Sequence, residues 1–384
     1  MRALALLAAL TTSPALAAPC GGPFGAFLGA MKTEATNLSR AEADRFFDRL
    51  SQDQKVLQAD RRQGVFRKPF TEFARSLISR NRLENGLANA KKHANIFALA
   101  EKDYGIPAGI LLAFWGFETD YGAFQGDYNT ANALATLAHD CRRPELFQPQ
   151  LLAAATLWQR GEFDPATTTG AWAGEIGMVQ MLPSDIRAHG VDGDGDGKVS
   201  LKTSAADALL SGARVLQGLG WQAGQPWLQE ITLPADFAWQ DTGLRTTRPA
   251  SEWAAMGAQP RAGQFADLPA SIILPEGRKG PTFITYPNFS VLFEWNQSFV
   301  YVTTAAYFAN RLMGAPVFNA GNPDPQLSLE ETKTLQQKLQ SRGYDVGGID
   351  GILGTNTRDA VRKEQQRLGL PADAWPTRAL LEAL

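Results

Sequence analysis

The feature that most constrains this chain is an uninterrupted apolar run, residues 108–117, which ends in one acid, Glu118. Gly105-Ile106-Pro107 precedes the run and places proline where the first turn of a helix accepts it. Gly122 is suited to end the same helix. A helix that is apolar on all sides must be buried. The chain is therefore expected to contain a buried helix with a single carboxyl group near its C-terminal end.

The segments around this helix predict a mainly helical fold. Residues 35–103 show an apolar period near 3.6 with few Pro or Gly. The helices are expected at residues 41–50, 70–78 and 88–101. Residues 222–290 instead combine Pro, Gly and Trp with short β-prone runs at 271–274 and 282–286, which predicts small β or irregular insertions. Residues 298–313 return to a helical pattern.

The first seventeen residues are typical of an export signal. Arg2 precedes a short apolar stretch, residues 3–10, that is too short to span a bilayer. Ala15-Leu16-Ala17 fits the small-x-small rule for cleavage before Ala18. No other apolar run reaches the roughly 18 residues of a spanning helix. These patterns predict a periplasmic protein without a membrane span.

The chain has two cysteines, Cys20 and Cys141, among 384 residues. Export to an oxidising compartment makes them candidate disulfide partners, and two independent buried thiols are the alternative. The formal net charge of -2 gives no electrostatic footprint for nucleic acid. A composition of 44% hydrophobic and 20% charged residues is that of an ordinary globular protein.

Several common catalytic motifs are absent from the sequence. The three histidines, His93, His139 and His189, form no His-Glu-x-x-His pair, so a helix-borne zinc protease site is excluded. There is no Gly-x-Ser-x-Gly elbow and no P-loop. Nucleotide chemistry and Ser-His-Asp hydrolysis are therefore poor hypotheses.

Glu118 is the outstanding candidate for chemistry. Burial and the negative end of the helix dipole both favour its protonated form. A carboxylic acid that keeps its proton near neutral pH can protonate a glycosidic oxygen. The alternative is a helix-end glutamate that points to water or pairs with an arginine. Asp120 and Tyr121 follow directly and could line the same cleft. Residues 174–184 form an apolar strip with one Gln180, which is either a sugar-contacting wall or a turn between helices.

An acidic loop matches the calcium loop of an EF-hand. Asp192, Asp194 and Asp196 occupy positions 1, 3 and 5, and Lys198 at position 7 would offer its carbonyl. Position 12 lacks the usual Glu, but Asp207 could serve if the loop is longer. The prediction is a structural calcium ion, and the alternative is an acidic surface turn.

The C-terminal part of the chain predicts a separate small module. Residues 315–325 have the Pro/Gly-rich composition of a linker. Ser328 to Glu331 is a capping box, residues 347–354 form a Gly-rich turn, and helices are expected at 355–368 and from Pro376 onward. Residues 326–384 therefore predict a three-helix binding module that carries no chemistry and folds on its own.

Several ordered motifs resemble the B-type lytic murein transglycosylases, which have a lysozyme-like fold. They are Tyr104-Gly105-Ile106-Pro107, Gly116 to Gly122, Asn132 to Leu137, Arg142-Arg143 with Phe147, Gly174 to Ser184, and Trp295-Asn296-Gln297-Ser298 with Tyr301. The resemblance covers roughly residues 22–314 and implies a catalytic domain at 18–314. The tail, with Leu335-Gln336, Gly343-Tyr344 and Asp350-Gly351, resembles the common peptidoglycan-binding domain.

The resemblance implies that Glu118 is the single catalytic acid and base. The residues expected to line the sugar cleft are Gln180, Tyr121, Trp295, Asn296 and Tyr301. Two departures stand out, because Ala171 replaces a serine that many relatives carry and Trp295 replaces the usual tyrosine. The implied partners are peptidoglycan glycan strands, with no catalytic cofactor and a monomeric enzyme.

The implied reaction explains why one carboxyl is enough. Ordinary glycosidases need two, an acid and a base or nucleophile. A lytic transglycosylase uses the C6 hydroxyl of the muramic acid as the nucleophile and forms a 1,6-anhydro sugar without water. Two other functions stay open, a non-catalytic wall-binding scaffold and a muramidase that uses water. A muramidase needs a second carboxylate, and Glu175 is the candidate.

Overall fold

The computed structural model describes residues 18–61 and 68–384, so the predicted signal peptide at 1–17 lies outside the described residues. The fold is mainly helical, as predicted. The chain divides into two compact units. The first holds the described residues up to 61 together with 126–175 and 182–187, and the second holds the remainder. Across the described residues every helix is too short or too polar to span a bilayer.

The first unit is a helical bundle around α8 and α9. Its helices are α1 (Phe24–Glu34), α2 (Arg40–Phe47), α3 (Gln54–Arg61), α8 (Thr130–His139), α9 (Pro144–Gln159) and the start of α10 (Pro183–His189). Two short antiparallel strands, β1 (Tyr128–Asn129) and β2 (Thr169–Gly170), lie at its edge. Small side chains such as Ala135 in α8 and Ala154 in α9 are completely buried, which lets the two helices pack closely.

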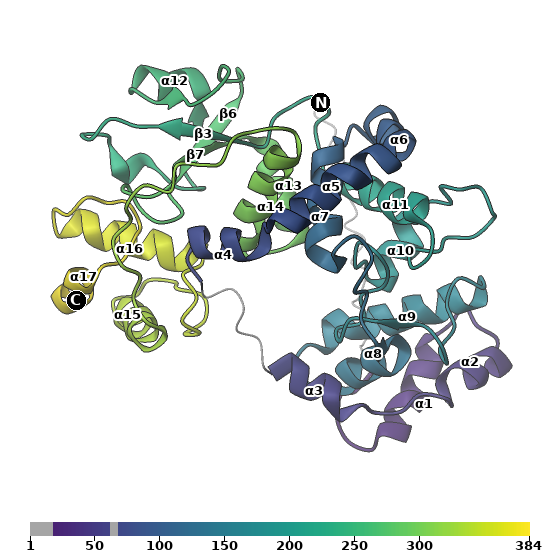
Figure 1. Ribbon diagram of the computed structural model, residues 1–384. Coiled ribbons are helices and arrows are strands. Elements are labelled where there is room, and N and C mark those ends of the chain that lie inside the picture. Colours follow the sequence, from purple (N-terminus) through teal and green to yellow (C-terminus); the bar gives the residue numbers. More distant parts are fainter. Residues whose placement is uncertain (1–17, 62–67) are drawn as a thin grey trace, which may run out of the picture. The chain divides into compact units, whose positions relative to one another are not determined.

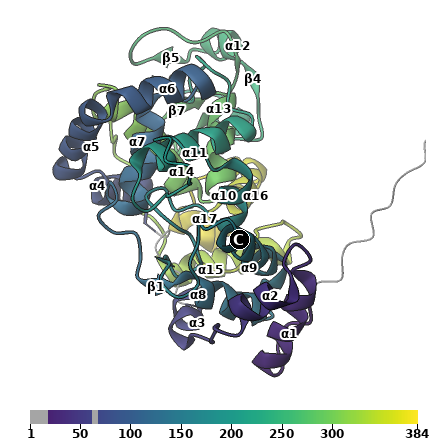
Figure 2. The same ribbon diagram turned by 90° about the vertical axis from the view of Figure 1, so that its right-hand side faces the viewer.

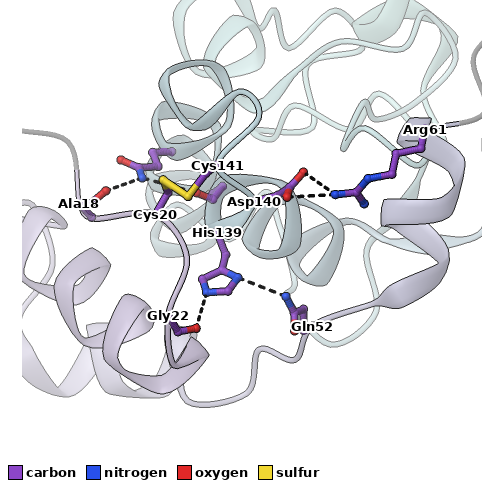
Figure 3. Close-up of a disulfide and its surroundings, with 10 residues drawn as sticks. Ala18, Cys20, Gly22, Gln52, Arg61, His139, Asp140 and Cys141 are labelled. Atoms are coloured by element: carbon purple, nitrogen blue, oxygen red, sulfur yellow. Dashed lines mark hydrogen bonds and ion pairs between the residues drawn. A yellow bond between two sulfur atoms is a disulfide. The ribbon is translucent and has the colours of Figure 1, made fainter.

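A disulfide holds the N-terminal segment of this unit to the end of α8. Cys20 and Cys141, the predicted pair, are bonded to each other, and Figure 3 shows the surroundings. His139 lies beside the bond, with Nε2 3.0 Å from the carbonyl oxygen of Gly22 and Nδ1 3.2 Å from the amide nitrogen of Gln52. A carbonyl only accepts, so Nε2 carries the proton and Nδ1 accepts from Gln52.

The second unit is built around α7, the predicted buried helix. The same unit contains α4 (Phe70–Leu77), α5 (Arg80–Lys92), α6 (Ala94–Tyr104), α11 (Ala205–Gly218), α13 (Pro287–Trp295) and α14 (Phe299–Leu312), together with the sheet and the tail described below. α7 (Ala108–Thr119) packs against α5, α6, α11 and α14 (Figures 1 and 2). Residues 109–116 of α7 are all buried, which confirms the interpretation of the apolar run.

The ends of these helices differ from the sequence expectation at three points. Pro107 caps α7 instead of starting its first turn, and the helix ends at Thr119 because Asp120 adopts a left-handed conformation with φ 50°. Gly122 is therefore not the helix terminator. The single helix expected over 88–101 is two helices, broken at His93, whose imidazole packs against Trp115 at 5.5 Å. This contact between distant parts of the chain is invisible to local periodicity.

A five-stranded antiparallel sheet is inserted between α11 and α13. Its order is β4-β6-β7-β3-β5. The strands are β3 (Leu228–Thr232), β4 (Arg248–Pro249), β5 (Gln259–Pro260), β6 (Pro269–Ile273) and β7 (Phe283–Thr285), with α12 (Ala250–Ala255) and a short 3₁₀ helix, Trp239–Asp241, beside them. Trp253 of α12 fills the sheet's own core and donates its indole N–H to the carbonyl of Ala270. The two predicted β-prone runs became β6 and β7.

The C-terminal tail has three helices, α15 (Leu329–Ser341), α16 (Thr355–Arg367) and α17 (Arg378–Ala383). The capping box at the start of α15 is present. Buried leucines form the core of the tail, together with Val346, Ala360 and Val361. The tail belongs to the same compact unit as the helices around α7, although the sequence presents it as a separate module.

Residues 315–325, expected to be a linker, lie against the second unit. Phe318 is buried, with ring centroids 5.1 Å from Phe70 and 4.9 Å from Tyr307. Further on, Asn322 donates its backbone N–H to the carbonyl of Lys279. Phe318 and the backbone of Asn322 therefore anchor the segment to the rest of the second unit, while most of its residues are exposed.

Candidate active site

Glu118 lies in the last turn of α7, half-buried, where α7 meets the start of α14. Tyr301 in the first turn of α14 donates its hydroxyl to Glu118 Oε1 at 2.5 Å. The indole N–H of Trp295 points to the same oxygen at 3.4 Å. The structure therefore brings Glu118 together with two residues that lie more than 170 positions further along the chain.

Tyr301 is a hydrogen-bond donor that stays protonated. Burial, and next the negative charge of Glu118, raise the pKa of the Tyr301 hydroxyl well above its ordinary value. A donor that contacts a carboxylate favours the ionised carboxyl. The hydrogen bond from Tyr301 therefore acts against the protonated form of Glu118 that the sequence predicts.

The segment before α14 places Tyr301 by local capping. Ser298 caps α14, and its hydroxyl accepts from the backbone N–H of Tyr301. Asn296 accepts the backbone N–H of Ser298 at 2.9 Å, which closes the turn from α13 into α14. Trp295 stacks on Phe114 of α7 with ring centroids 4.6 Å apart. These contacts orient both donors toward Glu118.

The chain after α7 is locked by polar contacts. The Thr119 hydroxyl donates to the carbonyl of Met178 at 2.6 Å and accepts from the backbone N–H of Gly122. Arg82 pairs with Asp120 at 3.0 Å, and Tyr121 donates its hydroxyl to the carbonyl of Arg82 at 2.8 Å. The hydroxyl of Tyr121, a predicted sugar contact, is therefore used to hold the helix end.

Gln180 lies in a tight turn with φ 51°, closed by an antiparallel bridge between Ile176 and Met181. Its amide nitrogen donates to the carbonyl of Gly177 at 2.7 Å. Since Thr119 binds Met178 in the same turn, Gln180 is held near the end of α7. The amide group of Gln180 therefore stabilises a turn. A turn was one of the two structures that the sequence allowed for residues 174–184.

Sequence reasoning missed the residues that support the site from a distance. Arg82 and Thr119 fix the end of α7, and Phe117 stacks on Phe308 of α14 at 4.9 Å. Thr119 stands inside the recognised motif and could have been found there. Arg82 is an arginine on a polar helix, and no local pattern distinguishes it from a solvated one.

The carboxylate of Glu175 lies in the first unit. Its Oε2 atom is buried without a hydrogen-bond partner, and burial raises the pKa of the carboxyl. Backbone hydrogen bonds at Glu175 and Ala173 act in the opposite direction and lower the pKa of the same carboxyl.

The Asp-rich loop gathers three exposed carboxylates. One oxygen from each of Asp192, Asp194 and Asp196 lies within 4.8 Å of the others. Asp192 accepts the backbone N–H groups of Gly195 and Gly197, at 2.7 and 2.8 Å. A set of carboxylate oxygens on a tightly turned loop suits a hard cation such as Ca²⁺.

Asp207, the fourth carboxylate among the predicted metal ligands, is completely buried at the start of α11. Its two oxygens accept the backbone N–H groups of Gly193 at 2.9 Å and Ser200 at 2.6 Å. Asp207 therefore ties the two ends of the loop to the helix. The backbone N–H of Lys198 donates a hydrogen bond to Oδ1 of Asp196 at 2.9 Å.

A mainly helical fold with one carboxyl group at the end of a buried helix defines a lysozyme-like enzyme. The family model described as transglycosylase SLT domain matches residues 24–310. A second model, for a peptidoglycan binding domain, matches residues 328–384. The chain belongs to the transglycosylase SLT family.

Solved structures and a curated relative agree with this assignment. SltB3 from Pseudomonas aeruginosa, crystallised with NAG-anhNAM-pentapeptide, is 36% identical, with a TM-score of 0.86 over 94% of this chain and 99% of that chain. Membrane-bound lytic murein transglycosylase B of Escherichia coli is 27% identical over 228 residues, which are 59% of this chain and 62% of that protein. The chain thus spans about three fifths of the length of this curated relative.

A second similar structure shows the fold alone. The Escherichia coli lytic transglycosylase Slt35, solved in complex with calcium, is 24% identical, with a TM-score of 0.65 over 74% of this chain and 92% of that one.

Proposed function

We propose that this protein is a peptidoglycan lytic transglycosylase that cleaves the β-1,4 bond from N-acetylmuramic acid to N-acetylglucosamine without water. The observation that carries the proposal is the single carboxyl of Glu118, held by Tyr301 and Trp295 at the end of α7. SltB3, which resembles this chain over almost its whole length, binds muropeptides of both the anhydro and the ordinary form.

In the proposed reaction Glu118 acts first as an acid and then as a base. Both donors point to Oε1 of Glu118, and we place the transferable proton on the same carboxyl group. That proton moves to the glycosidic oxygen as the bond to the muramic C1 breaks. The C6 hydroxyl of the same sugar then bonds to C1 and returns its proton to Glu118. The nucleophile comes from the substrate, so no second carboxylate is needed.

The residues around Glu118 take different proposed roles. Relatives usually carry a tyrosine at the position of Trp295. We propose that the indole N–H of Trp295 replaces the tyrosine hydroxyl as a hydrogen-bond donor. Asn296 is the proposed sugar contact through its amide nitrogen, while Trp295 and Tyr301 are the proposed hydrogen-bond donors to Glu118. Gln180 and Tyr121 have polar groups engaged by the backbone, so we assign them to the walls of the site.

The products test this proposal directly. Digestion of purified sacculi is expected to give muropeptides with a 1,6-anhydro ring, lighter by one water, about 18 mass units, because a single acid/base activates an internal hydroxyl. Mass spectrometry separates the outcomes. Products that carry only reducing-end N-acetylmuramic acid would show a muramidase that uses water, and intact sacculi would show a wall-binding scaffold.

We propose a structural calcium ion in the Asp192–Asp196 loop, with no role in catalysis. Its ligands would be the three aspartates and the carbonyl of Lys198, the spacing of positions 1, 3, 5 and 7 in calcium loops. Asp207 holds the loop in shape and stays outside this ligand set.

Calcium is expected to raise the melting temperature of the protein by at least about 2 °C at saturating concentration, since the ion binds only the folded loop. Differential scanning calorimetry with calcium and with a chelator measures the shift. Asp194→Ala with Asp196→Ala should remove the response, whereas Asp236→Ala, at an exposed acid outside the loop, should keep it. Identical melting curves with calcium and with chelator would show that the loop is an acidic turn that does not bind calcium.

We further propose that the protein works in the periplasm as a monomer on peptidoglycan strands. The bond between Cys20 and Cys141 supports this location, because disulfides persist in oxidising compartments.

A further inference from the structure

Arg358 of α16 joins the C-terminal tail to the sheet of the second unit. Its guanidinium donates to the carbonyl of Pro275 at 2.7 Å and to that of Leu274 at 3.3 Å, both in the chain that leaves β6. A third bond, from Nε, reaches the carbonyl of Leu353 within the tail at 3.1 Å. One side chain thus connects a helix of the tail to the backbone of the catalytic part.

The same guanidinium stacks on the first residue of α14. Its central carbon lies 4.6 Å from the ring centroid of Phe299. The same carbon lies 5.7 Å from the ring centroid of Trp375. Phe299 is buried and starts the helical turn that contains Tyr301. Tyr301 donates to Glu118, so Arg358, Phe299, Tyr301 and Glu118 form a continuous series across the unit.

The surroundings of Arg358 are low in water and incompletely packed. Burial lowers the pKa of its guanidinium to about 9. A cavity of about 180 Å³ lies next to it between the tail and the start of α14. Its lining includes Phe70, Ser298, Phe299, Ile352, Leu353 and Trp375. Close packing is therefore missing beside the cap of α14, where the guanidinium of Arg358 stacks on Phe299.

Other contacts hold the tail in the same place. Arg245 pairs with Asp359 and donates to Asn356 at 2.7 Å. The backbone N–H of Arg278 donates to Asp373 at 3.1 Å. These bonds do not involve α14, so they can keep the tail docked when Arg358 is changed.

We propose that Arg358 is a positioning residue for the reaction: the docked tail acts through Arg358 and Phe299 to hold the first turn of α14, and thereby keeps Tyr301 against Glu118. The inference rests on the proposed function of Glu118. It gives the tail a task inside the active site in addition to binding the wall.

Kinetics on a short soluble glycan strand test this role, because such a substrate does not depend on wall binding. Arg358→Ala is expected to lower kcat about tenfold or more and to leave KM within about twofold, since a small misplacement of a catalytic group is costly. Arg358→Lys should recover part of the loss. Arg367→Ala, which removes another guanidinium of α16 that pairs with Glu364, serves as the matched control and should match wild type.

A double-variant cycle shows whether Arg358 acts through Tyr301. Tyr301→Phe combined with Arg358→Ala should be no slower than Tyr301→Phe alone, because coupled residues are not additive. Losses that multiply, or a kcat of Arg358→Ala equal to that of Arg367→Ala, would overturn the proposal.

Hydrogen exchange separates this inference from the proposed function. Backbone amides at residues 299–303 should lose protection in Arg358→Ala and keep it in Arg367→Ala, whether or not the protein cleaves glycan. Unchanged protection there would also overturn the inference. A wild-type protein that yields no anhydro product would instead refute the proposed function.

Discussion

Glu118→Gln is expected to abolish glycan cleavage while leaving the fold unchanged. The amide keeps the shape of the side chain and can still accept the hydrogen bonds of Tyr301 and Trp295 on its oxygen. It has no proton to give to the glycosidic oxygen. General acid catalysis is worth about 10²–10⁴-fold, and here the same group is also the base of the second step. We therefore expect a loss at or beyond the upper end of this range.

The measurement is release of soluble muropeptides from sacculi, with circular dichroism to show that the variant is folded. Glu101→Gln, at an exposed glutamate of α6, is the control and should retain full activity. If Glu118→Gln kept more than about a tenth of wild-type activity, the assignment of Glu118 would be refuted.

Removal of the disulfide is expected to produce the largest loss of stability. Cys20 and Cys141 are separated by 121 positions, so the bond closes a long loop in the unfolded chain. A bond of this kind contributes about 2–5 kcal/mol to the free energy of unfolding. The bond also keeps two hydrogen bonds of the N-terminal segment in place, from Gln148 to the carbonyl of Ala18 and from His139 to that of Gly22 (Figure 3).

Urea denaturation of Cys20→Ser with Cys141→Ser measures this loss against wild type. Reductant should lower the unfolding midpoint of the wild type and leave that of the double variant unchanged, which is the internal control. A double variant as stable as the wild type would show that the helices of the first unit hold the N-terminal segment by themselves.

Local patterns predicted the elements of this fold well. The apolar run gave the buried helix α7, two β-prone runs gave β6 and β7, and the capping box gave the start of α15. Each of these signals depends on residues a few positions apart. The break at His93 depends on packing against Trp115, which lies in another helix, so periodicity could not show it.

The active site was predictable only in part for the same reason. Glu118 stands out because a charge at the end of an apolar helix is unusual. Its link to Trp295 and Tyr301 came from resemblance to a family, since no spacing rule connects residues so far apart in the chain. Arg82 and Arg358 were missed because an arginine on a helix has no local mark that distinguishes a buried guanidinium from a solvated one.

The packed segment at Phe318 has a practical consequence for any rearrangement of this enzyme. A shortened protein that ends before Phe318 would expose the ring faces of Phe70, Phe283 and Tyr307 to water. A foreign wall-binding module grafted at this boundary would have to bring an aromatic side chain of its own to cover them. The boundary that the Pro/Gly-rich stretch suggests is thus a poor place to cut. A chimera joined after Asn322 would keep the connecting chain secured to Lys279, but it would still lack the contact of Arg358 with Phe299.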